Sequence, residues 1–146
     1  MSRTVEPTNL DGAFSQAFTP RYYEIDGQGV MFNMWYLGYV DEAVTAFFEH
    51  RGLSYASWPE LGFDVHVAHV ELDWHDGIRH TDRSEVLVGT SRIGGKSFTL
   101  DFAFRRDGAL TCTGHIVYVA VAADGSGTVP LPPVLIEALG EAAPQG

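Results

Sequence analysis

Apolar residues between positions 34 and 51 recur at steps of three and four, the period of an amphipathic α-helix. The residues that carry this pattern are Tyr36, Leu37, Val40, Ala43, Val44, Phe47 and Phe48. Gly52 follows directly and can end the helix in a left-handed conformation. Because apolar residues cover much of the circumference, we expect this helix to be largely buried.

Most of the remaining chain alternates apolar and polar residues with the period of two that is typical of β-strands. The sequence Asp107-Gly108 between two such segments predicts a tight hairpin, because both residues tolerate a positive φ. One long helix with an antiparallel sheet is an α+β fold, in which the sheet needs the helix to cover its apolar face. The predicted strands are residues 18–25, 63–74, 84–93, 98–105 and 110–121.

The length of 146 residues fits a single domain over residues 1–146. Pro, Asn, Asp and Gly in residues 1–14 predict a loose N-terminal arm. An Ala-, Pro- and Gly-rich segment over residues 134–146 predicts a C-terminal tail.

The net charge of −10, with Lys96 as the one lysine, argues against binding to nucleic acid or to an anionic membrane surface. No apolar stretch is long enough to span a bilayer, and the first residues do not resemble a secretory signal. The single Cys112 cannot form an internal disulfide, and its strand context predicts a buried thiol. We therefore expect a cytoplasmic protein.

Asp26 lies in a glycine-containing turn between a predicted strand and the start of the long helix. A helix N-terminus carries unpaired backbone N–H groups and a partial positive charge. A carboxylate beside such donors can act as a nucleophile or general base, and the donors can stabilise an oxyanion. Asp before Gly is also a common turn residue without any catalytic role, so both interpretations remain open.

Residues 26–32, Asp-Gly-Gln-Gly-Val-Met-Phe, followed by Tyr36, resemble the signature of the 4-hydroxybenzoyl-CoA thioesterase family of hotdog-fold proteins. The likeness continues through the acidic-then-Ala stretch of the helix and the later strands, and it covers about residues 17 to 133. The segments that carry it are residues 41–43, 70–74, 81–82, 92–97 and 128–132.

The resemblance implies a hotdog fold, in which an antiparallel five-stranded sheet wraps around one long central helix. It implies hydrolysis of an acyl-CoA or acyl-carrier-protein thioester by a homodimer or homotetramer that forms through edge strands. Thioester hydrolysis needs a base or nucleophile and a site for negative charge on oxygen. It needs no metal or other cofactor, because a thiolate is already a good leaving group.

In the resembled family the residue at Asp26 is the nucleophile or the general base, and the backbone N–H at Asn33 polarises the thioester carbonyl. The resemblance carries both roles to this chain. Many relatives have His or Tyr at the position of Asn33. The alternative to a catalytic role for the Asn33 side chain is a structural role as the helix N-cap.

The resemblance also suggests which residues bind the substrate. Coenzyme A carries phosphates, so an acidic protein must gather its few cations to hold them, and Arg79, Arg83, Arg92 and Lys96 lie within one stretch of the chain. The alternative interpretation is that each of these cations, and Asp41 on the helix, is an ordinary solvated surface charge. The expected substrate-binding residues are Gly29, Tyr36, Asp41, Arg92, Lys96 and Ser97.

The histidines do not form a recognisable metal motif, and we expect no metal site. His66 and His69 are three apart on a predicted strand, which places them on opposite faces. Neither a His-Glu-x-x-His nor a Gly-x-Ser-x-Gly motif is present. The alternative to a thioesterase is a non-catalytic hotdog protein that binds acyl groups or an acyl-carrier protein, and a hotdog dehydratase is a weaker third choice.

Overall fold

The computed structural model describes residue 10 and residues 13–142. Its strands and helices follow one another as β1 (Phe14–Phe18), α1 (Tyr36–His50), β2 (Phe63–Trp74), β3 (Ser84–Ile93), β4 (Ser97–Arg106), β5 (Ala109–Ala122) and α2 (Pro133–Leu139). Short 3-10 turns lie at Tyr22–Glu24, Asn33–Trp35 and Tyr55–Ser57.

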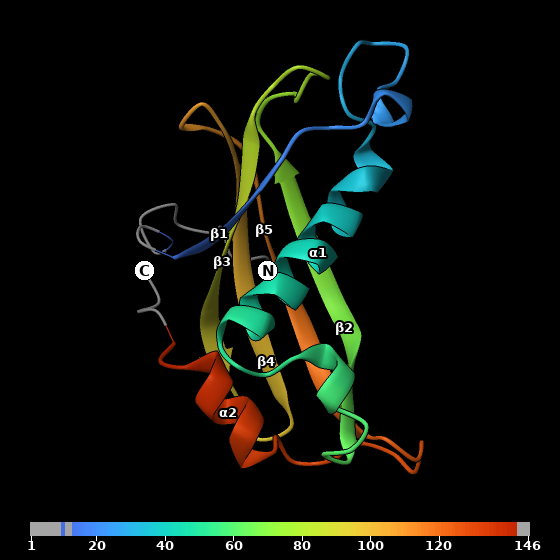
Figure 1. Ribbon diagram of the computed structural model, residues 1–146, viewed down its shortest axis with the longest axis vertical. Coiled ribbons are helices and arrows are strands. Elements are labelled where there is room, and N and C mark those ends of the chain that lie inside the picture. Colours follow the sequence, from blue (N-terminus) through green and yellow to red (C-terminus); the bar gives the residue numbers. More distant parts are fainter. Residues whose placement is uncertain (1–9, 11–12, 143–146) are drawn as a thin grey trace.

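The five strands form one antiparallel sheet in the order β1-β3-β4-β5-β2, so β1 and β2 are its two edges. Helix α1 lies across one face of this sheet (Figure 1). Phe98, Leu100, Phe102 and Phe104 on β4 point toward the helix and are fully buried, as their period of two predicts. The α+β class and the sheet packed on one long helix are confirmed.

Helix α1 ends where the sequence predicts. Arg51 is its C-cap, and Gly52 follows with a φ of 81°. The N–H of Leu53 then donates to the carbonyl of Phe48 at 2.9 Å, which satisfies one of the last carbonyls of the helix. The 3-10 turn Asn33–Trp35 continues directly into α1 and extends the helical segment toward the N-terminus.

Gly114 on β5 lies at a position where no side chain would fit. A Cβ at this position would lie 2.5 Å from the ring of Phe102 and would also overlap the backbone carbonyl of Glu71. Gly114 pairs with Phe102 on β4 and with Leu72 on β2. The missing side chain therefore leaves room for the Phe102 ring beside β5.

The first strand was predicted too late in the sequence. Strand β1 covers Phe14–Phe18, and the residues predicted to extend it form a 3-10 turn at Tyr22–Glu24. Pro20 has no N–H to donate to a ladder. The carboxylate of Glu24 then accepts a hydrogen bond from the N–H of Arg21 at 2.7 Å, which closes the turn.

The expected C-terminal tail contains a helix. Helix α2 spans Pro133–Leu139 and buries Leu135, Ala138 and Leu139. The guanidinium of Arg51 donates to the carbonyls of Ala138 and Leu139 at 3.0 and 3.2 Å. Distant contacts thus stabilise a helix that composition alone did not indicate.

Most of the expected N-terminal arm, residues 1–9, 11 and 12, lies outside the described residues. Leu10 is described, and it packs against Leu87 and Ala103 on the face of the sheet opposite α1. Within residues 10 and 13–142, no helix combines the length and apolarity that crossing a bilayer requires.

Candidate active site

The Asp26 turn is a compact loop closed by its own backbone. The N–H of Asp26 donates to the carbonyl of Val30 at 2.9 Å, and the N–H of Gly29 donates to the carbonyl of Asp26 at 3.0 Å. Gly29 has a φ of 81°, which favours glycine. Oδ1 of Asp26 accepts a hydrogen bond from the N–H of Gln28 at 2.8 Å. The turn uses one carboxylate oxygen, and Oδ2 takes no hydrogen bond from a described residue.

The segment after the turn is anchored on both sides. The N–H of Met31 donates to the carbonyl of Ile78 at 2.7 Å, and the N–H of Phe32 donates to the carbonyl of Glu24 at 2.8 Å. Phe32 is the N-cap of the 3-10 turn, so the structural role of N-cap does not belong to Asn33. Among the described residues, no group accepts a hydrogen bond from the backbone N–H groups of Asn33 and Met34.

Asp26, Asn33 and Tyr36 line one open cleft of about 580 Å³. Tyr36 is buried, and its ring packs edge-on against Trp74 with a centroid distance of 5.8 Å. Burial, followed by electrostatic interactions with neighbouring ionisable groups such as Asp76, raises the pKa of Tyr36 to about 12. Its hydroxyl is therefore protonated at neutral pH and can donate a hydrogen bond. The other lining residues are Gln28, Val30, Met31, Phe32, Trp74, His75, Asp76 and Gly77.

The loop after β2 forms the second wall of this cleft, and the sequence did not assign it to the site. Oδ1 of Asp76 accepts the N–H of Gly77 at 2.8 Å, and Oδ2 lies 2.7 Å from the Arg106 guanidinium. These two interactions, the backbone N–H first, hold the pKa of Asp76 below its ordinary value. Arg106 also donates to the carbonyl of Gly77. The local signal was a polar loop after a strand, which does not reveal the surface against which the loop packs.

Asp41 lies beside a different pocket, of about 300 Å³, between α1 and β2. Neighbouring protein atoms displace water from this carboxylate, and Glu42 adds a like charge, so the pKa of Asp41 is raised. Burial also raises the pKa of Tyr118 on the floor of the pocket. The remaining lining residues are apolar or aromatic, apart from Thr45: Val44, Phe48, Tyr55, Trp58, Val65 and Val67.

Arg92, Lys96 and Ser97 lie at the other end of the sheet from Asp26. Ser97 begins β4 and Arg106 ends it. Arg106 contacts the cleft loop, and a ten-residue strand is roughly 30 Å long. One copy of the chain therefore does not bring these three residues to the Asp26 cleft.

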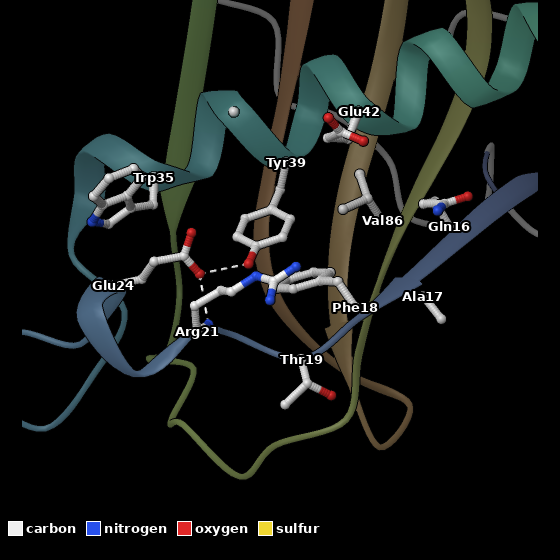
Figure 2. A pocket seen from close by; sticks show the side chains of 11 residues that line it. Gln16, Ala17, Phe18, Thr19, Arg21, Glu24, Trp35, Tyr39, Glu42 and Val86 are labelled. Atoms are coloured by element: carbon white, nitrogen blue, oxygen red, sulfur yellow. Dashed lines mark hydrogen bonds between the residues drawn. The ribbon is translucent and has the colours of Figure 1, made fainter.

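A third cavity, of about 530 Å³, lies between β1 and the first turns of α1. Figure 2 shows Glu24 and Tyr39 pointing toward each other in this cavity, with the Arg21 side chain extended beside them. The hydroxyl of Tyr39 donates to Oε1 of Glu24 at 2.5 Å, and Glu24 is buried. The Glu24 carboxylate therefore holds the backbone just before Asp26 against helix α1.

Two other sequence predictions have clear outcomes. Cys112 is buried as predicted, and burial raises the pKa of its thiol to about 12, which makes it a poor nucleophile. The prediction that His66 and His69 face opposite sides is wrong. A bulge at Ala68 leaves His66 opposite Val119 and His69 opposite Val117, two residues apart on β5, so both point to the same face.

Solved structures with the same architecture include proteins described as thioesterases. The chain is similar to a thioesterase superfamily protein from Jannaschia sp. CCS1, with 19% identity, a TM-score of 0.84 and coverage of 92% of this chain and 95% of that one. It is similar to a 1,4-dihydroxy-2-naphthoyl-CoA thioesterase from Synechocystis, with 20% identity, a TM-score of 0.79 and coverage of 88% and 96%. It is also similar to the gentisyl-coenzyme A thioesterase BH1999, with 18% identity, a TM-score of 0.79 and coverage of 87% and 100%.

These likenesses bear out the hotdog fold. No curated protein matches the sequence. The sequence pattern of the thioesterase-like superfamily matches residues 20–139, which is most of the chain. The chain therefore belongs to the thioesterase-like superfamily.

Proposed function

We propose that this protein hydrolyses an acyl-CoA thioester to the free acid and coenzyme A, with the signature at residues 26–32 favouring the 4-hydroxybenzoyl-CoA thioesterase family. One observation carries the proposal: the Asp26 carboxylate and the Asn33 end of the helical segment line the same cleft. Asp26 keeps one carboxylate oxygen outside the turn's hydrogen bonds, and Asn33 keeps an unused backbone donor. These are the two groups that thioester hydrolysis requires.

The reaction needs only these groups and water. The Asn33 N–H, with that of Met34 beside it, hydrogen-bonds the thioester carbonyl oxygen and stabilises the oxyanion. If Asp26 acts as a base, it takes a proton from water while the water oxygen bonds to the carbonyl carbon. If it acts as a nucleophile, its oxygen bonds to that carbon and water later cleaves the anhydride. In both routes the C–S bond breaks and the thiolate leaves and is protonated.

The acyl group is proposed to extend from the cleft toward the pocket beside Asp41. That pocket is mostly apolar and carries a carboxyl group of raised pKa, which suits an acyl group with a polar substituent. Two of the similar structures are thioesterases for gentisyl-CoA and 1,4-dihydroxy-2-naphthoyl-CoA, whose acyl groups are hydroxylated aromatics. Tyr36 lines the cleft and can donate a hydrogen bond there, and Gly29 in the adjoining turn has open space beside its backbone.

The working form is proposed to be a homodimer or homotetramer. Val67 and Trp74 on edge strand β2, Met34 in the 3-10 turn and Leu37 in α1 are exposed apolar residues, and we place a second copy against them. A second copy on this side would bring its own Arg92, Lys96 and Ser97 toward the first copy's cleft, where they would bind coenzyme A phosphates. Light scattering should give at least twice the chain mass, and a stable species of 16.0 kDa at micromolar concentration would refute the assembly.

A panel of acyl-CoA esters, with release of free thiol recorded, tests the function. The panel should contain short aliphatic, long aliphatic and hydroxylated aromatic acyl groups, each on coenzyme A and on an acyl-carrier protein. We expect turnover of at least one member well above the rate without protein. The alternative function, non-catalytic binding of acyl groups or an acyl-carrier protein, predicts saturable binding of the same compounds without thiol release.

A further inference from the structure

Two histidines and a glutamate meet on the face of the sheet opposite α1. Glu71 on β2 pairs directly with His115 on β5, and His69 lies two residues from Glu71 on the same face. The neighbours of His115 on β5 alternate with it, so Ile116 points into the core beneath α1 while His115 points away from it. None of the three belongs to the cleft or the pockets described above.

The donor atoms of the three side chains lie within 4.8 Å of one another. Nε2 of His69 is 2.9 Å from Oε1 of Glu71, and Nε2 of His115 is 3.9 Å from Oε2 of Glu71. Tetrahedral zinc with bonds near 2.0–2.1 Å needs ligand atoms roughly 3.3 Å apart. Small rotations of three side chains on two paired strands would therefore reach that spacing.

Burial separates this cluster from an ordinary surface ion pair. His115 is only 8% exposed, and its Nδ1 has no hydrogen-bond partner among the described residues. With Nδ1 unpaired, no hydrogen bond from that nitrogen to a described residue fixes this buried ring, and Nε2 is the nitrogen that lies toward Glu71. The His69 side chain, by contrast, is 52% exposed, so an ion can reach the cluster from solvent.

We propose that His69, Glu71 and His115 form a binding site for a divalent first-row transition metal, with Zn²⁺ as the best match. Two imidazoles and one carboxylate are donors that zinc accepts, whereas Mg²⁺ and Ca²⁺ prefer oxygen ligands throughout. Three protein ligands leave a fourth position for water. Because the ligands come from edge strand β2 and its neighbour β5, the ion would link these two strands just after the bulge at Ala68.

Zinc binding to purified, chelator-treated protein tests this site. Calorimetry or competition with a chromogenic zinc chelator should give one Zn²⁺ per chain for the wild type, and a large excess of Mg²⁺ should not displace it. His69→Gln and Glu71→Gln should each weaken the affinity by at least about tenfold, because losing even a residue that only supports a metal ligand costs this much. Both changes lie at an accessible edge, so the variants should fold. His80→Gln is the matched control, because His80 is an exposed histidine whose ring packs on Tyr22.

Thermal unfolding gives a second readout that does not depend on hydrolysis. An ion that binds only the folded state should raise the Tm of the wild type and of His80→Gln, and it should not raise the Tm of His69→Gln. The absence of stoichiometric binding would overturn the proposal. It would also be overturned if the two cluster variants bound Zn²⁺ as tightly as His80→Gln does, because the ion would then lie elsewhere.

Discussion

The hydroxyl of Tyr39 donates a hydrogen bond of 2.5 Å to the buried carboxylate of Glu24. Tyr39 lies in the first turn of α1, and Glu24 lies two residues before Asp26. The same carboxylate accepts the N–H of Arg21, and the carbonyl of Glu24 accepts the N–H of Phe32. Glu24 thus connects the helix, the start of the Asp26 turn and its end, as Figure 2 shows for the side chains.

Replacing Tyr39 with Phe should destabilise the fold. The change leaves a buried carboxylate short of one donor, which costs about 1–3 kcal/mol. Urea unfolding of the variant and the wild type measures the difference. Tyr55→Phe is the control, because the exposed Tyr55 hydroxyl lies 3.3 and 3.4 Å from the two Asp64 oxygens, and its loss should cost under about 0.5 kcal/mol. Equal stability losses in the two variants would contradict the anchoring role of Glu24.

Gly114→Ala should also destabilise the protein, for a steric reason. The added methyl group would overlap the Phe102 ring and the backbone of Glu71 in the centre of the sheet, and overpacking of this kind costs about 1–3 kcal/mol. Gly95→Ala is the matched control, because no atom lies within 4 Å of its added Cβ and its φ is not positive. A drop in Tm for the first variant alone is expected, and two unchanged Tm values would argue against this packing.

Charge reversal at Arg92 and Lys96 tests the proposed phosphate contacts. Arg92→Glu and Lys96→Glu should raise KM for an acyl-CoA more than they lower kcat, because the phosphates lie far from the reacting carbon. The effect should shrink as salt rises, since charges are screened over about 10 Å at 0.1 M.

A pantetheine thioester that lacks the nucleotide is the control substrate for these variants. Its KM should not change. Equal damage to both substrates would assign Arg92 and Lys96 a structural role, and the phosphate site would then be sought at Arg79 and Arg83. No effect on either substrate would make them ordinary surface charges.

The elements that depend on local signals were predictable from the sequence. Periodicity predicts the long helix, and residues that tolerate a positive φ predict its end at Gly52 and the hairpin at Asp107-Gly108. The structure has φ values of 81° at Gly52, 51° at Asp107 and 80° at Gly108. Elements that depend on distant contacts were not. Helix α2 is held by Arg51 and by the Thr90 hydroxyl, which donates to the Leu139 carbonyl at 2.6 Å. The bulge at Ala68 has no signature in residues 63–74.

The candidate site divides in the same way. The Asp26 turn and the start of the helix are adjacent in the sequence, so their proximity could be inferred from local structure. The loop of His75 and Asp76 reaches the same cleft through backbone and ion-pair contacts with Met31 and Arg106, and only the folded chain reveals this. The distance of Arg92 and Lys96 from Asp26 follows from the length of β4 and from the contact of the cleft loop with Arg106 at the far end of that strand, and the sequence does not specify this contact.

Asp124 forms a similar turn outside the cleft, so it serves as a control that separates the catalytic role of Asp26 from its role in the turn. Oδ1 of Asp124 accepts the N–H of Ser126, two residues later, at 2.8 Å, and Oδ1 of Asp26 accepts the N–H of Gln28 with the same spacing and distance. Asp124 lies in the exposed turn after β5 and does not line the Asp26 cleft. Asn preserves the acceptor oxygen of such a turn but cannot act as a base or nucleophile.

The kcat for thiol release by Asp26→Asn, compared with Asp124→Asn and the wild type, is the most direct test of the central claim. Asp26→Asn should lower kcat by at least about a hundredfold, the scale of losing a general base, while its unfolding midpoint stays close to that of Asp124→Asn. Asp124→Asn should keep the wild-type kcat. If Asp26→Asn retained more than about a third of the wild-type kcat, Asp26 would be a turn residue and the proposed mechanism would be wrong.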